Sequence, residues 1–288
     1  MNKIADQWSS YQLLYAGDCW RIENWQGIIL KRPDPMALWP LPKQNTKIAA
    51  VYHRSKSGGG TWEYLKPLPE SWQLSYGSLT FKVAPLGFKH TGLFPEQAAN
   101  WDSISAMIKK VTYPVKLLNL FAYTGGASLA AALAGAEEVV HVDASRGMVK
   151  WAQENQKLSN LNNHKIRFIV DDCLKFIAKE QRRNNKYQAI ILDPPSFGRG
   201  PNKEIWQFEQ QINLLIKESA RLLADDALFF LLNGYTAGYS SEVLKNLLCS
   251  SDLIKRHFKT VLAGELLLPV VKQDIYLPSG SYGIAYND

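Results

Sequence analysis

Four short, largely apolar runs separated by helical stretches dominate the second half of the chain. They cover residues 117–121, 138–143, 166–172 and 189–192. Apolar runs of this length are typical of parallel strands that are buried on both faces. Between the second and third runs, residues 145–160 carry apolar side chains at helical spacing. The alternation predicts an α/β fold, a Rossmann-like doubly wound sheet.

The fourth run leads into the most informative motif of the chain. Residues 189–200 read AIILDPPSFGRG, and the strand must stop at Asp193 because Pro194 and Pro195 cannot continue a sheet ladder. Open α/β sheets bind ligands at the carboxyl ends of their strands. An acid, two rigid prolines and the aromatic Phe197 suit a flat, nitrogen-bearing ring held beside a reactive cofactor. The alternative is a loop that merely ends a strand, with Phe197 as a structural plug.

The first run leads into a glycine turn. Residues 117–127 read LLNLFAYTGGA, in which Gly125 and Gly126 form a tight turn before an alanine-rich helix. The second run closes on Asp143, 18 residues beyond Gly125. Glycines let the backbone approach a nucleoside, and a carboxylate accepts hydrogen bonds from ribose hydroxyls. The alternative for Asp143 is a surface carboxylate at a strand end.

A nicotinamide dehydrogenase uses a similar layout, but its fingerprint is G-x-G-x-x-G. Here Ala127 and Ser128 follow Gly126, so the third spaced glycine is missing. The third run ends in a further acidic pair, Asp171 and Asp172. Four strand tips therefore carry a glycine turn, an acid, an acidic pair and Asp-Pro-Pro. A hydride-transfer enzyme is a distant alternative, which nicotinamide binding would identify.

Together these motifs resemble class I S-adenosylmethionine-dependent methyltransferases, and more narrowly the bacterial ribosomal RNA large-subunit methyltransferase-like group. The resemblance runs from about Gly87 to the C-terminus. It rests on five segments, Lys89–Gln97 (KHTGLFPEQ), Asn119–Gly126 (NLFAYTGG), Val142–Ser145 (VDAS), Asp171–Asp172 and Asp193–Gly198 (DPPSFG). Each segment alone is unspecific, and the five together are specific.

The resemblance implies S-adenosylmethionine as the cofactor. Its methionine moiety would meet the first loop, its ribose Asp143 and its adenine amine Asp171 or Asp172. The segment before the first strand would fold over the cofactor. The implied cofactor-binding residues are Phe94, Gln97, Asn119, Phe121, Tyr123, Thr124, Gly125, Gly126, Asp143, Ala144, Ser145, Asp171, Asp172 and Asp193. Structural alternatives are packing of Phe94 on the sheet edge, a core amide at Asn119 and a helix N-cap at Thr124.

The cysteines argue against methylation of cytosine carbon 5. Enzymes of that kind attack the ring with a thiolate, which in this family follows the fifth strand. The matching stretch, residues 228–235, reads LFFLLNGY and places Asn233 near that position. Cys19, Cys173 and Cys249 lie elsewhere, and Cys249 is expected in the core.

A nitrogen acceptor needs no covalent step. The Asp-Pro-Pro motif resembles that of amino-methylating enzymes, in which the Asp side chain and a proline carbonyl accept hydrogen bonds from the target amine. We therefore assign catalysis to Asp193, Pro194 and Pro195, with Phe197 stacking on the base. The remaining catalysis is alignment of amine, methyl group and sulfonium. A ring nitrogen such as guanine N7 fits as well.

The amino-terminal part has a different pattern. Runs such as 20–23 and 79–83 alternate apolar and polar residues, which predicts half-buried antiparallel strands. Residues 57–60 read SGGG and predict a hairpin tip. Seven of the nine tryptophans lie at or before Trp101. This indicates a small β-rich domain.

The charge of this part suggests an RNA contact. Residues 1–114 carry 13 Lys/Arg against 8 Asp/Glu, and the rest of the chain is close to neutral. Basic and aromatic side chains together favour nucleic-acid binding. The alternative is that most of these tryptophans are core residues. The candidate contact residues are Lys43, Lys47, His53, Arg54 and Lys56.

The length of 288 residues suits two domains, for which we predict 1–86 and 87–288, with 87–114 as a lid or linker. We expect an antiparallel last strand over Gly280–Tyr286. No apolar run is long enough to span a membrane and no signal core is seen. Three unpaired cysteines favour the cytoplasm, and no ligand-spaced cluster indicates a metal.

RNA, of ribosomal origin by resemblance, is the expected substrate. Two other classes of function remain open, a methyltransferase of a small molecule or protein and a non-catalytic RNA-binding module. A neutral surface on the amino-terminal domain would favour the first. The oligomeric state, monomer or homodimer, is also open.

Overall fold

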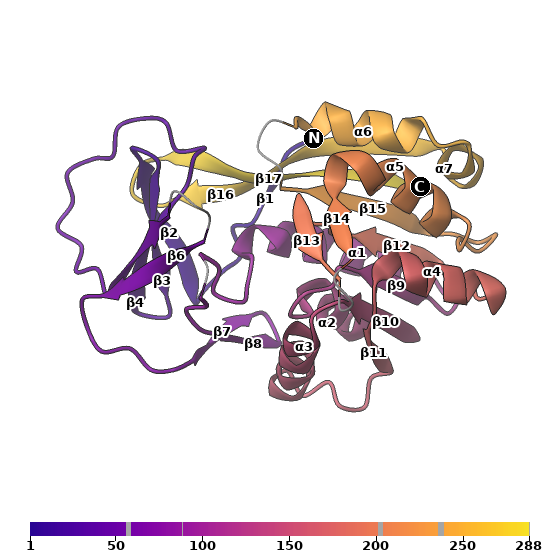
Figure 1. The fold of residues 1–288 in the computed structure, drawn as a ribbon, viewed down its shortest axis with the longest axis horizontal. Coiled ribbons are helices and arrows are strands. Elements are labelled where there is room, and N and C mark those ends of the chain that lie inside the picture. The colour runs from indigo at the N-terminus through magenta and orange to yellow at the C-terminus, as the bar shows by residue number, and fades with distance from the viewer. Residues whose placement is uncertain (56–58, 88, 201–203, 236–238, 288) are drawn as a thin grey trace. The chain divides into compact units, whose positions relative to one another are not determined.

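The computed structural model describes residues 1–55, 59–87, 89–200, 204–235 and 239–287. The chain forms two compact units, coloured by residue number in Figure 1. The α/β unit comprises Met1–Lys3, Asn100–Leu266 and Gly280–Asp288, and the β unit comprises Ile4–Ala99 and Leu267–Ser279. Residues 87–99 therefore pack with the β unit, whereas a functional boundary at residue 86 stays a prediction.

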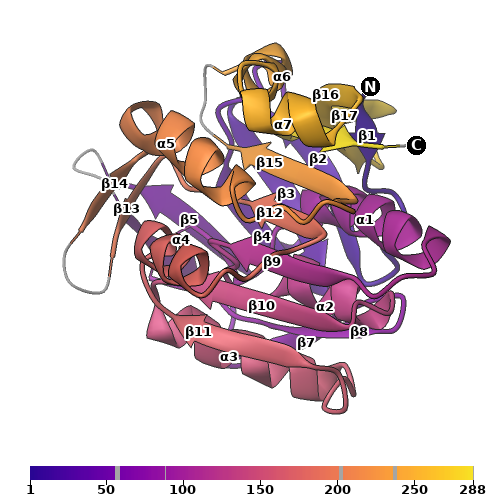
Figure 2. The same ribbon diagram turned by 90° about the vertical axis from the view of Figure 1, so that its right-hand side faces the viewer.

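The α/β unit is built on a sheet with the strand order β11-β10-β9-β12-β15-β17 (Figure 2). All neighbours pair in parallel except β17, which is antiparallel to β15. The strands are β9 (Lys116–Leu120), β10 (Glu138–Asp143), β11 (Ile166–Val170), β12 (Ala189–Leu192), β15 (Phe229–Gly234) and β17 (Ile275–Tyr286). The predicted doubly wound sheet and its antiparallel last strand are confirmed, although β17 begins before Gly280.

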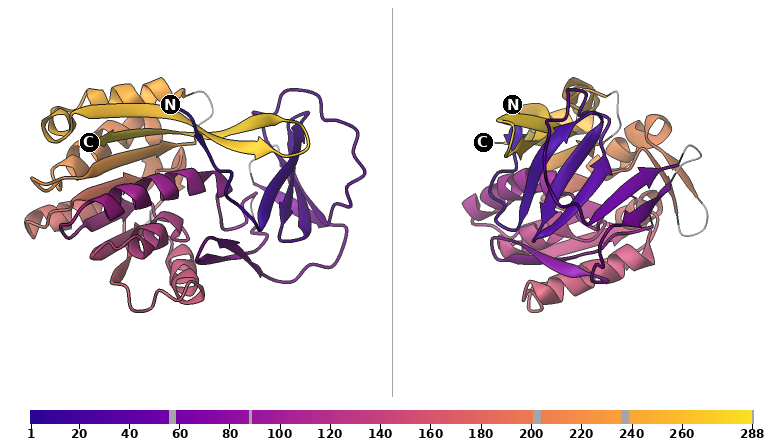
Figure 3. Two further views of the ribbon diagram at one scale, coloured as in Figure 1. Left: turned by 180° about the vertical axis from the view of Figure 1, so that it is seen from behind. Right: turned by 90° about the vertical axis from the view of Figure 1, so that its left-hand side faces the viewer.

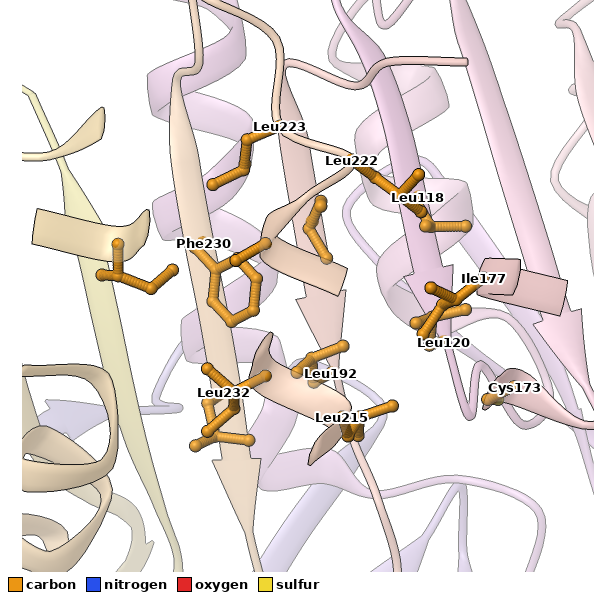
Figure 4. Packing of buried hydrophobic residues seen from close by; sticks show 14 of the residues in the cluster. Leu118, Leu120, Cys173, Ile177, Leu192, Leu215, Leu222, Leu223, Phe230 and Leu232 are labelled. Carbon is orange, nitrogen blue, oxygen red and sulfur yellow. The ribbon is translucent and has the colours of Figure 1, made fainter. Parts of the chain in front are cut away.

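Helices cover both faces of this sheet. Helices α4 (Cys173–Arg182), α5 (Phe208–Ala220), α6 (Ser241–Cys249) and α7 (Asp252–His257) pack on one face. Leucines of β9, β12 and β15 meet α4 and α5 there in an apolar core (Figure 4). Helices α1 (Ala98–Lys110), α2 (Gly126–Leu133) and α3 (Arg146–Leu158) cover the opposite face (Figure 3, left). Among the described residues, no helix is long and apolar enough to cross a bilayer.

The β unit contains the alternating strands that the sequence predicts. Their order is β16-β2-β3-β4-β5-β6, with β7 and β8 as a separate hairpin (Figure 3, right). The strands are β2 (Tyr11–Gly17), β3 (Trp20–Trp25), β4 (Ile28–Pro33), β5 (Ala50–Arg54), β6 (Gly60–Tyr64), β7 (Trp72–Tyr76) and β8 (Leu79–Val83). Strands β1 (Lys3–Ile4) and β16 (Thr260–Val270) each have residues in both units. Most pairs are antiparallel, but β4–β5 and β16–β2 are parallel. The expected hairpin tip is residues 57–60, of which 57 and 58 lie outside the described part of the chain, and β5 and β6 pair on either side of it.

A buried group of charges lies in the core of the β unit. The Arg32 guanidinium donates to both oxygens of Glu23 at 2.7 Å, and Tyr11 Oη donates to Oε1 of Glu23 at 2.8 Å. Arg21 lies 3.5 Å from both Glu23 and Asp34. Two of the arginines counted in the basic balance are therefore neutralised inside the unit.

Close packing between two helices fixes the start of α2. A Cβ atom added to Gly126 would lie 2.3 Å from Cζ2 of Trp101 on α1, and Trp101 is only 4% exposed. Only glycine leaves room for that indole ring. The glycine therefore serves packing as well as the turn.

We expect Gly126→Ala to lower the free energy of unfolding by about 1–3 kcal/mol, because the Trp101 ring has no space to move away. Chemical denaturation would measure the change. Gly147→Ala in α3 is the control, since its new methyl group would meet only Ser145 Oγ, at 3.8 Å. The control should equal or exceed the stability of the parent, and equal losses in both variants would contradict the packing argument.

Candidate functional site

The parallel strands of the α/β unit end at one edge of the sheet, and the predicted acids gather there. The register pairs Leu120 with both Val142 and Leu192, so Asp193 follows the tip of β12 beside β9. The Asp193 backbone N–H donates to the Leu120 carbonyl at 3.2 Å. On the other side, the Asp171 N–H donates to the Asp143 carbonyl at 3.2 Å.

Asp143 joins two neighbouring loops. Its Oδ2 accepts a hydrogen bond from the Tyr123 N–H at 2.9 Å, and its Oδ1 accepts one from the Ser145 N–H at 2.8 Å. Burial raises the pKa of this carboxyl, and the two N–H groups oppose that rise. Ala144 lies half-buried between these contacts. The carboxylate is therefore a fixed part of the site, not a free surface acid.

The loop after β9 has an unusual backbone. Phe121 has a φ of 56°, Tyr123 of 51° and Gly125 of 93°. Left-handed conformations are unfavourable for aromatic residues and persist where surrounding contacts impose them. Besides Asp143, the Asn155 side chain holds this loop by donating to the Thr124 carbonyl at 2.9 Å. Gly125, and not Thr124, is the N-cap of α2, so that structural alternative for Thr124 is wrong.

A buried polar chain lies beneath the loop. Asn119 Nδ2 donates to Ser128 Oγ at 2.9 Å, and Ser128 Oγ lies 3.0 Å from His141 Nδ1. Burial lowers the pKa of His141 to about 3, so the imidazole is neutral. Sequence reasoning missed Ser128 and His141, although each interrupts an apolar run. Buried polar groups of this kind are retained when they are hydrogen-bonded.

The acidic pair after β11 has structural partners. Asp172 is the N-cap of α4, accepting from the Lys175 N–H at 3.0 Å. Asp171 forms an ion pair with Lys179 at 2.6 Å. Similarly, Ser145 caps α3 through Met148. A role for this pair at the adenine amine stays a prediction.

The Asp-Pro-Pro loop is held by a tryptophan that the sequence did not indicate. Strands β13 (Phe197–Arg199) and β14 (Ile205–Gln207) form a hairpin directly after the prolines. Trp206 Nε1 donates to the Pro195 carbonyl at 2.6 Å, and its ring lies 4.9 Å from that of Phe121. The indole thus links the Asp-Pro-Pro loop to the loop after β9. Phe197 is 53% exposed, which argues against a structural plug.

Phe94 and Gln97, the expected lid residues, belong to the β unit. Phe94 precedes a short 3₁₀ helix, η1 (Pro95–Gln97), and its ring lies 4.9 Å from that of His90. Gln97 is buried. Their contact with the cofactor stays a prediction.

Comparison with known proteins identifies the family. A family model described as S-adenosylmethionine-dependent methyltransferase matches residues 39–236, which is more than half of the chain. The chain belongs to the S-adenosylmethionine-dependent methyltransferases. A crystal structure of a member from Agrobacterium tumefaciens is 31% identical, with a TM-score of 0.90 over 99% of this chain and 93% of that chain.

Other relatives match over part of their length. Ribosomal RNA large subunit methyltransferase K/L of Colwellia psychrerythraea is 32% identical over 55% of this chain and 21% of its own length. The protein of the same name from Aeromonas hydrophila is 33% identical over 64% of this chain and 22% of its own length. The chain therefore matches about a fifth of these curated relatives. A methyltransferase-like structure with bound S-adenosylhomocysteine, 18% identical, shares the fold with a TM-score of 0.69 over 97% of this chain and 76% of that chain.

The edge of the sheet fits this cofactor. An ionised carboxylate has about four acceptor positions, and the two backbone N–H groups on Asp143 use only two. The remaining capacity suits ribose hydroxyls. The left-handed loop from Phe121 to Gly125 lies beside it. Asp143 and this loop are the residues that would hold the nucleoside.

We expect Asp143→Asn to weaken S-adenosylmethionine binding by about tenfold to a hundredfold, because a charged acceptor becomes a neutral amide. In the parent, affinity should fall as the pH drops and the carboxyl is protonated. This fall should begin at a higher pH than for an ordinary aspartate, because the pKa of Asp143 is raised. Calorimetry across pH measures both effects. Unchanged affinity in the variant would contradict the ribose assignment.

Proposed function

We propose that the protein transfers the methyl group of S-adenosylmethionine to RNA, at a base nitrogen and without a cysteine nucleophile. The names of the curated relatives support ribosomal RNA as the substrate. A substrate of that kind would place the reaction in the cytoplasm. The observation that carries the proposal is the Asp-Pro-Pro loop, held at the same sheet edge as Asp143.

This loop can hold an amine in line with a methyl donor. Asp193 is half-buried at the tip of β12, and Pro194 is buried behind it. The Asp193 side chain and the Pro194 carbonyl would accept the two hydrogens of an amino group. Phe197 is exposed and can stack on the base. Positioning of this kind accelerates methyl transfer without a covalent intermediate between enzyme and substrate.

The cysteines support an acceptor that needs no thiolate attack. Asn233 occupies the tip of β15, where the related cytosine-5 enzymes would carry the nucleophile. Cys173 is buried in the core, and burial raises its pKa well above the ordinary value, so it remains a thiol. Cys249, which we expected in the core, is exposed at the end of α6, where the sheet does not cover it.

The β unit has exposed cations that could contact phosphates. Lys43, Lys47 and Arg54 are exposed, while His53 Nε2 lies 2.7 Å from Glu63. Lys56 lies outside the described residues. Trp8 and Trp25 are buried, which favours the core interpretation for these two rings. The exposed cations are therefore the better support for an RNA contact.

The proposal is tested by methyl transfer from radiolabelled S-adenosylmethionine to RNA from cells that lack this protein. We expect label in RNA that disappears on nuclease treatment. Nucleoside analysis would then identify the methylated nitrogen. An absence of label in RNA, with cofactor binding intact, would contradict an RNA substrate and favour a small-molecule or protein acceptor.

A variant tests the Asp-Pro-Pro loop directly. Asp193→Ala should lower kcat by about a hundredfold or more, because the acceptor amine loses its positioning partner. Cofactor affinity should stay within about twofold of the parent, since Asp143 is untouched. Asp225→Ala, an exposed acid elsewhere in the α/β unit, is the matched control and should retain the parent rate. Parent activity in Asp193→Ala would refute the assignment.

A further inference from the structure

A lysine far from the motifs takes part in a buried hydrogen-bond chain. Lys3 on β1 is partly buried, and its Nζ donates to Asn100 Oδ1 at 2.9 Å. The same ammonium lies 4.0 Å from the centroid of the Tyr282 ring. Lysine is seldom buried without a specific partner. This placement therefore calls for an explanation.

Asn100 extends the contact towards the sheet. Its Nδ2 donates to Asn233 Oδ1 at 2.9 Å, and the two asparagines are only 1% and 2% exposed. Tyr282 on β17 lies directly opposite Asn233 on β15 in the antiparallel ladder. Four elements of the α/β unit thus meet here, β1, α1, β15 and β17, through Lys3, Asn100, Asn233 and Tyr282.

The hydrogen-bond chain from Lys3 ends beside the proposed acceptor site. Leu192 on β12 pairs with Leu232 on β15 in a parallel ladder. Asp193 follows β12 directly, and Asn233 is the next residue of β15, so these two residues lie at the same edge of the sheet on neighbouring strands. The polar chain from Lys3 therefore reaches the neighbour of the Asp-Pro-Pro loop.

The charge on Lys3 sets which groups donate and which accept along this hydrogen-bond chain. An ammonium group only donates hydrogen bonds, so it requires the oxygen of Asn100. The Asn100 amide nitrogen must then face Asn233, which presents its own oxygen in return. A neutral amine can also accept, so its contact would no longer favour one orientation of the Asn100 amide. The proton on Lys3 thus favours one orientation of the Asn100 amide, and through it of the Asn233 amide.

We propose that Lys3 and Asn100 are positioning residues for methyl transfer, which hold the Asn233 amide in one orientation beside the Asp193 loop. The inference rests on the proposed function, because that function places the acceptor at Asp193. It assigns Lys3 and Asn100 no contact with substrate or cofactor.

The titratable surroundings of Lys3 give the inference a pH signature. Burial lowers the pKa of Lys3 to about 8. Burial raises the pKa of Tyr282 to about 12, so this phenol stays neutral while Lys3 titrates. β16, which pairs with β1, carries Glu265, whose carboxylate accepts a hydrogen bond from Ser281 at 3.0 Å. Asn100 on α1 has no titratable group. The orienting proton should therefore be present at neutral pH and lost as the pH rises above about 8.

The test is kcat against pH at saturating S-adenosylmethionine and RNA from cells lacking the protein. For the parent, kcat should fall as the pH passes about 8. Lys3→Met should lower kcat at neutral pH by about tenfold and lack this fall, because its side chain neither donates nor titrates. Lys3→Arg keeps the charge, so its kcat should stay level across the same range. Asn100→Asp accepts only, which reverses the Asn233 amide, so it should lower kcat as Lys3→Met does.

Controls separate a positioning role from a structural one. Lys31→Met removes another lysine that lies over an aromatic ring, 4.4 Å from the Trp20 centroid, and should leave kcat and its pH profile unchanged. Calorimetry should give the parent cofactor affinity for Lys3→Met. The same fall above pH 8 in Lys3→Met as in the parent, or a loss of cofactor affinity equal to the loss of kcat, would overturn the inference. Full activity of Asp193→Ala, or no labelled RNA with the parent, would instead overturn the proposed function.

Discussion

The cofactor end of the site depends on the two hydrogen bonds that Asp143 accepts. One carboxylate fixes the Tyr123 N–H in the loop after β9 and the Ser145 N–H at the start of α3. Together with the Asn155 contact to the Thr124 carbonyl, these bonds offset the left-handed backbone of Phe121 and Tyr123. Burial makes the charge costly, and the two donors offset that cost. The residue that we propose as the ribose partner thus also fixes the shape of the loop.

Two buried polar chains support the two ends of the site. At the cofactor end, Ser128 and the neutral His141 hold Asn119 beneath the glycine turn. At the proposed acceptor end, Asn100 Nδ2 donates to Asn233 Oδ1 on the strand next to β12. Buried hydrogen bonds restrict the side chains that form them. The α/β unit therefore presents a rigid edge, which suits a reaction that proceeds by alignment.

The sequence predicted the features that local pattern determines. Apolar runs identified the parallel strands, and acids at the ends of three of them identified tips such as Asp143 and Asp193, because parallel strands end at one edge. Contacts between distant segments were missed, since no spacing links Trp206 to Pro195, or Lys3 to Asn100. The pairing of β4 with β5 in parallel likewise follows from tertiary packing, which alternation along one strand does not report.

A crystal structure with S-adenosylhomocysteine tests the central claim most directly, because it shows which residues hold each part of the cofactor. The account predicts that both ribose hydroxyls lie within hydrogen-bond distance of the Asp143 carboxylate and that the sulfur faces Asp193. A nucleoside bound away from Asp143, or a sulfur directed away from the Asp-Pro-Pro loop, would contradict it.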